Sequence, residues 1–217
     1  MADFTIYIGN KNYSSWSLRG WLMLKQTGAT FAEEMIPLDQ ATTRPGILRH
    51  SPSGKVPALR HGERVIWESL AIGEYLAELF PAARLWPEAQ EARALARAVS
   101  AEMHAGFAAL RRHLPMNLRS SFPDRGVTPE VQADIDRIVA LWGDCRRRFG
   151  AGGPYLFGAL TMADAMYAPV VSRFRTYRVA LGAPAQAYCD AVWAWPALQE
   201  WAAAAEREPM VIPRLEF

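Results

Sequence analysis

The chain has 217 residues, which allows one large domain or two small ones with a substantial hydrophobic core. Hydrophobic residues make up 51% of the chain and charged residues 21%, a balance typical of soluble globular proteins. The net charge of +2 is too small to indicate a nucleic acid or an anionic membrane as partner. No window approaches the roughly 18 consecutive apolar residues of a membrane span.

The two cysteines, Cys145 and Cys189, are far apart and form neither a metal-binding pattern nor a disulfide framework. The first residues lack the basic region and long apolar run of a signal peptide. These features predict a cytoplasmic protein without a bound metal.

The first part of the chain alternates predicted strands and helices. Residues 4–8 are rich in β-branched and aromatic side chains and predict a strand. The serine-rich segment 13–17 leads into a helix with its body at 18–27. Residues 31–37 predict a second strand, and a short irregular or helical piece follows at 42–50.

The next stretch, residues 53–70, reads SGKVPALRHGERVIWESL. Pro57 restricts Val56 to an extended backbone, and two short strands then flank a turn at 61–63. A helix begins at Glu68 and Ser69, where unpaired N–H groups favour an anion. This stretch therefore places an extended backbone edge beside an anion-binding helix start, which suits a small peptide with a carboxylate at one end. Taken separately, the serine could be a simple cap and the Val-Pro pair a simple loop.

From residue 88 onward only helices are predicted. A long helix covers 89–114, with an apolar stripe that includes Met103 and Phe107, and a second covers 129–149. Thr161 and Asp164 form a capping-box pattern that opens another helix. A last helical part runs through 193–205.

Two motifs, GKVPAL and ESLAIGEYL, resemble the glutathione site of the glutathione S-transferase family. The resemblance covers nearly the whole chain. It implies an α/β N-terminal thioredoxin-like domain at 1–80 that binds glutathione and a linker at 81–87. An all-α C-terminal domain at 88–217 would contribute the second-substrate pocket. It also implies glutathione as co-substrate or cofactor, a small electrophilic substrate, a role in detoxification and a homodimer.

Carried over residue by residue, the family pattern assigns parts of glutathione to particular residues. The Val56–Pro57 bond would be cis, and the backbone of Val56 would pair with the cysteinyl part. Glu68 and Ser69 would hold the γ-glutamyl end. Lys55 is expected to contact glutathione through its charge, although an exposed turn lysine is almost as good an interpretation.

The run SSWSLR resembles the SSCSWR signature of the zeta class, which includes maleylacetoacetate isomerase. The match implies that Ser14 and Ser15 are catalytic, in an undecided order. Lowering a thiol pKa of about 8.5 by about two units requires roughly 2.7 kcal/mol. One hydrogen bond to the thiolate contributes roughly 1.5–3 kcal/mol, so one hydroxyl suffices. Tyr7 and Tyr13 are weaker candidates. Trp16 replaces the zeta cysteine and cannot form a mixed disulfide.

The second-substrate pocket is the least specified part of the sequence. In the fold that the resemblance implies, this pocket lies between the first helix and the helices of the second domain, and the candidates there are Trp16, Met103, His104, Phe107, Arg111 and Arg175. Met103 and Phe107 stand at helical spacing, which is more typical of core than of pocket residues. Zeta-class enzymes hold an acidic substrate with an arginine whose position here is taken by Thr176, which weakens the case for an isomerase. The alternatives to a transferase are therefore a zeta-like glutathione-dependent cis–trans isomerase and a noncatalytic glutathione-binding or regulatory protein.

Overall fold

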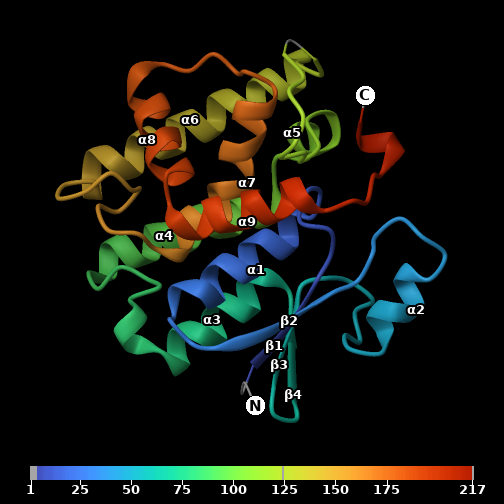
Figure 1. Cartoon of the computed structure of the whole chain (residues 1–217). Helices are drawn as coiled ribbons and strands as arrows, with labels where there is room; N and C mark the ends of the chain where they lie inside the picture. Colours follow the sequence, from blue (N-terminus) through green and yellow to red (C-terminus); the bar gives the residue numbers. More distant parts are fainter. Residues whose placement is uncertain (1–3, 124, 217) are drawn as a thin grey trace.

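The computed structural model describes residues 4–123 and 125–216. The first part of the chain has the predicted order of elements. These are β1 (Phe4–Ile8), α1 (Ser15–Gln26), β2 (Phe31–Met35), α2 (Thr43–Leu48), β3 (Ala58–His61), β4 (Arg64–Trp67) and α3 (Ser69–Leu79). A short 3-10 helix, η1 (Pro81–Ala83), then leads to the helical part. The predicted fold class, an α/β domain followed by an all-helical domain, is confirmed (Figure 1).

The four strands form one mixed sheet in the order β2-β1-β3-β4. The central strand β1 pairs parallel to β2 and antiparallel to β3. All five residues of β1 are buried, as expected for an apolar strand at the centre of a sheet. The β3–β4 hairpin turns at Gly62, whose φ of 59° is easily reached by glycine.

Helix α1 lies between the sheet and the helical part, where it packs against α3 and α7 (Figure 1). Its one glycine, Gly20, allows a close approach of the loop before β3. A Cβ atom on Gly20 would lie 2.9 Å from Cγ of Pro57. Glycine at position 20 therefore lets Pro57 pack closely against α1.

The remaining described residues contain only helices. They are α4 (Gln90–Ala105), α5 (Ala108–His113), α6 (Pro129–Phe149), α7 (Met162–Thr176), α8 (Ala183–Trp193), α9 (Pro196–Arg207) and the 3-10 helix η2 (Pro213–Leu215). The predicted single helix at 89–114 is wrong, because the chain breaks between α4 and α5. Gly106 leaves the helical conformation there, and Phe107 has a left-handed backbone with φ of 56°.

Helix α7 is the buried centre of the helical part. Its start carries the predicted capping box, in which the carboxylate of Asp164 accepts a hydrogen bond from the N–H of Thr161 at 2.8 Å. The same carboxylate accepts from the N–H of Leu156 and the hydroxyl of Tyr188, both at 3.1 Å. Burial raises the pKa of Asp164 to about 6, which leaves it ionised at neutral pH. These contacts hold the start of α7 in place, so Thr161 and Asp164 support the fold.

Among the described residues, no helix combines the length and apolar character that crossing a membrane requires.

Candidate functional site

A cavity of about 570 Å³ opens where the start of α1, the loop before β3, the helical part and the C-terminal segment meet. Most of the predicted site residues lie on its wall. These are Ser14, Ser15, Trp16, Lys55, Val56, Pro57, Glu68 and Arg111. Segments far apart in the sequence therefore line one cavity.

The two candidate serines differ in what their hydroxyls contact. Ser14 is the N-cap of α1, and its Oγ accepts from the N–H of Ser17 at 3.3 Å. The Ser14 hydroxyl also donates to Oγ of Ser17 at 2.7 Å, and that oxygen accepts from the N–H of Gly9 at 2.9 Å. Ser15 is the first residue of α1 and lines the cavity. Its hydroxyl makes no hydrogen bond with any described residue, so of these two serines Ser15 is the one whose hydroxyl is free to donate to a ligand.

The Val56–Pro57 bond is cis. The N–H and C=O of Val56 form no hydrogen bond with the described residues, which leaves both groups available to an extended peptide on the cavity side. Lys55 lies on the same wall.

The start of α3 supplies a carboxylate and a hydroxyl. Glu68 lines the cavity with a positive φ of 69°. Ser69 is buried, and its Oγ has no hydrogen-bond partner among the described residues. A buried hydroxyl without a partner is uncommon in native proteins, so a missing ligand group or water is a natural explanation. This feature fits a glutathione γ-glutamyl end, although Ser69 itself is not on the cavity wall.

Trp16 forms the wall on the side of the helical part, where cationic groups surround it. The guanidinium carbons of Arg19 and Arg111 lie 4.5 and 5.4 Å from its ring centroid. The ring of His104 lies 5.0 Å away. Trp16 therefore both packs against neighbouring side chains and lines the cavity.

His104 lies between a carboxylate and two guanidinium groups. Its Nε2 is 3.5 Å from Oε2 of Glu68. Burial lowers the pKa of His104, Glu68 opposes that shift, and the charges of Arg19 and Arg111 add to it. A neutral imidazole does not neutralise Glu68, so the carboxylate remains available to an ammonium group.

Three predicted pocket residues lie elsewhere, and the prediction is corrected for them. Met103 and Phe107 are buried in the core and do not line the cavity. Arg175 stacks on Trp193, with its guanidinium carbon 4.3 Å from the ring centroid, and lines a different cavity. The tyrosine alternatives lose support as well. Tyr7 stacks on His50 away from the cavity, and the hydroxyl of Tyr13 is hydrogen-bonded to Glu216.

The C-terminal segment adds wall residues that the sequence did not indicate, namely Ile212, Arg214 and Leu215. They follow the last α-helix and carry no motif, so no local signal could have found them. Among the described residues, no cluster of three or more His, Cys, Asp or Glu side chains is arranged to hold a metal ion.

Two family models match most of the chain. The family model for the glutathione S-transferase N-terminal domain matches residues 13–79, and that for the C-terminal domain matches residues 90–204. Glutathione S-transferase L2, chloroplastic, of Arabidopsis thaliana is 25% identical over 159 residues, or 72% of this chain. The chain spans about half of that relative, since the match covers 49% of its length.

Maleylacetoacetate isomerase of Rattus norvegicus is 27% identical over 165 residues, which cover 73% of this chain and 66% of that protein. A solved glutathione transferase homolog from Burkholderia GL BGR1, with bound glutathione, superposes with a TM-score of 0.72. It is 23% identical, and the match covers 94% of this chain and 98% of that chain, which supports the fold. The two family models together span most of the sequence, and the chain belongs to the glutathione S-transferase family.

Proposed function

We propose that this protein is a glutathione transferase in which the Ser15 hydroxyl stabilises the glutathione thiolate for attack on a small electrophile. The observation that carries the proposal is the free hydroxyl of Ser15, on the cavity wall at the first residue of α1. Ser14 stands beside it but uses its hydroxyl to cap the helix. The two serines would therefore have different roles: Ser15 donates to the thiolate, and Ser14 caps the helix.

One hydrogen bond from Ser15 supplies enough free energy to keep the glutathione thiol ionised near neutral pH. Holding the thiol ionised near neutral pH requires lowering its pKa by about two units, or roughly 2.7 kcal/mol. A hydrogen bond to the sulfur anion supplies roughly 1.5–3 kcal/mol, and the helix N-terminus adds roughly 0.3–1 kcal/mol. The thiol proton passes to solvent, and the sulfur then forms the new bond to the electrophilic carbon. With an aryl halide the carbon–halogen bond breaks, and halide leaves with its electron pair.

Glutathione would lie along the cavity wall with its cysteinyl part on the backbone of Val56. The free N–H and C=O of that residue fit an extended peptide. The γ-glutamyl ammonium of glutathione would pair with Glu68. The γ-glutamyl carboxylate would accept a hydrogen bond from the hydroxyl of Ser69, which has no partner among the described residues. Lys55 would add a contact through its charge. The second substrate would lie against Trp16 and Arg111.

The isomerase alternative has support from the rat maleylacetoacetate isomerase similarity. It would use the same thiolate and release glutathione unchanged after cis–trans rotation. Thr176, at the position of the zeta-class arginine, donates to the C=O of Asn117 at 2.7 Å and is buried. The residues at hand therefore favour transfer over isomerisation. The homodimer, the role in detoxification and the cytoplasmic location stay predictions from the sequence.

Turnover of glutathione with an activated aryl halide tests the proposal. Ser15→Ala should lower kcat/KM by about 10- to 150-fold, because one hydrogen bond to a charged group is lost. Ser14→Ala removes a helix cap, so we expect it to cost about 1 kcal/mol of stability and to reduce the rate less. An unchanged rate in folded Ser15→Ala would refute serine activation at this residue. Tight glutathione binding without turnover of any electrophile would favour the noncatalytic alternative.

A further inference from the structure

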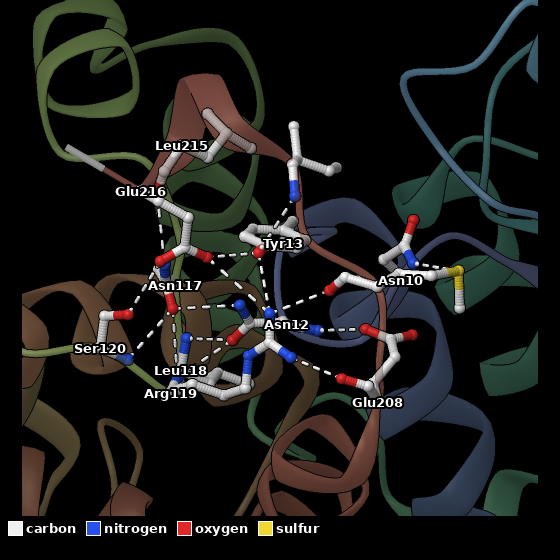
Figure 2. A network of polar contacts seen from close by, with 12 residues as sticks. Asn10, Asn12, Tyr13, Asn117, Leu118, Arg119, Ser120, Glu208, Leu215 and Glu216 are labelled. Atoms are coloured by element: carbon white, nitrogen blue, oxygen red, sulfur yellow. Dashed lines mark hydrogen bonds and ion pairs between the residues drawn. The ribbon is translucent and has the colours of Figure 1, made fainter.

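The loop that carries the serines is held by residues from the other end of the chain (Figure 2). The carboxylate of Glu208 accepts from the N–H groups of Lys11 and Asn12 at 3.0 and 3.2 Å. Oδ1 of Asn12 accepts from the N–H groups of Leu118 and Arg119 at 2.7 and 3.0 Å. The loop before α1 is thus fixed on both the C-terminal segment and the helical part.

Tyr13 directly precedes the serine pair, and its phenolic oxygen takes part in three hydrogen bonds. Its oxygen accepts from Nη2 of Arg119 at 2.9 Å and from the N–H of Ile212 at 3.3 Å. Both partners can only donate, so the phenolic hydrogen needs a separate acceptor. The Glu216 carboxylate is that acceptor. Its other oxygen accepts from the hydroxyl of Ser120 at 3.0 Å, which fixes the carboxylate in turn.

The position of Tyr13 reaches Ser15 through the backbone. The C=O of Tyr13 accepts from the N–H of Ser15 at 3.1 Å, and the ring of Tyr13 lines the same cavity as Ser15. A displacement of Tyr13 would therefore move the first residue of α1. Misplacing a reacting group by about 1 Å can cost on the order of 100-fold in rate.

We propose that Glu216 is a positioning residue for thiol activation, which fixes Tyr13 and through it the direction of the Ser15 hydroxyl. This inference rests on the proposed function. Glu216 does not line the cavity, so its effect on the reaction would be indirect. Arg119 supports the same arrangement, since its Nη2 lies 3.8 Å from Oε1 of Glu216.

The test compares kcat, the KM for glutathione and the pH profile of kcat/KM in variants of the full chain. Glu216→Ala should lower kcat by about tenfold or more, change the KM for glutathione much less, and move the acid limb of the profile to higher pH. Glu216→Gln keeps an oxygen that accepts from Tyr13 and should retain most of the rate. Tyr13→Phe removes the contact to Glu216 together with those to Arg119 and Ile212, so adding Glu216→Ala to Tyr13→Phe should lower kcat little further.

Glu206→Ala is the matched control, because Glu206 is an exposed residue of α9 with no hydrogen bond or ion pair to a described residue. Its kinetics should equal those of the wild type. Wild-type kcat and pH profile in Glu216→Ala and Tyr13→Phe, alongside a loss in Ser15→Ala, would overturn the positioning role and leave the proposed function intact. A wild type without glutathione-dependent turnover would instead overturn both.

Discussion

At the scale of single residues, the pKa of His104 depends on the charged groups of the cavity wall. Burial lowers its pKa, Glu68 raises it, and Arg19 and Arg111 lower it further. We therefore expect the pKa of His104, followed by NMR titration, to lie below the ordinary value of 6.5. Glu68→Gln removes the opposing carboxylate and should lower that pKa again, whereas Arg111→Gln should raise it. A rise in Glu68→Gln would contradict this account of the wall.

The sequence pointed to the two candidate serines and to the Val-Pro loop because their motifs are local, and these residues line one cavity. It named two neighbours on one helix, Met103 and His104, as candidates for the pocket, and only His104 lies on the cavity wall. Successive residues of an α-helix point about 100° apart, so Met103 faces the core while His104 faces the cavity. The apolar stripe favoured the core for Met103 and Phe107, and both side chains are buried there.

At the scale of elements, the start of α7 depends on Asp164. Asp164→Asn would turn an N–H₂ group toward the donors that the carboxylate now accepts from, leaving at least one of them unsatisfied. We expect a loss of about 3 kcal/mol, or roughly 6–12 °C in melting temperature at this size. The rate per folded molecule should not change.

The matched control is Asp144→Asn in α6. Asp144 forms ion pairs with Arg147 and Arg148 at the surface, and such pairs contribute about 0–1 kcal/mol. The melting temperatures of the two variants compare the loss of a buried carboxylate, Asp164, with the loss of a surface carboxylate, Asp144. Equal losses in the two variants would show that the buried capping box is not a special support of the fold.

The sequence also predicted most elements, because strands, caps and helix stripes are encoded within a few neighbouring residues. The break between α4 and α5 was missed, because apolar residues continue at helical spacing across it, from Met103 to Phe107 and Leu110. The cavity residues Ile212 and Leu215 could not be foreseen either. They reach the site only through contacts between distant segments, such as Asn117 with the C=O of Leu215 at 3.2 Å.

At the scale of the whole molecule, ligand binding should stabilise the fold by mass action. Glutathione at about a hundredfold over its Kd adds roughly 2.7 kcal/mol, which should raise the melting temperature by on the order of 5–10 °C. Ser69→Ala should lose most of this shift, because its hydroxyl is proposed to hold the γ-glutamyl carboxylate. Absence of a shift at millimolar glutathione in folded wild type would place the noncatalytic alternative first.

The most direct test of the central claim is a titration of the bound glutathione thiol, followed by the ultraviolet absorbance of its thiolate. In the wild type, we predict a pKa about two units below the ordinary value of about 8.5. Ser15→Ala should return it close to that value, whereas Ser14→Ala should leave it near the wild-type result. A pKa that stays low in Ser15→Ala would contradict activation by this hydroxyl and assign it to another donor at the start of α1.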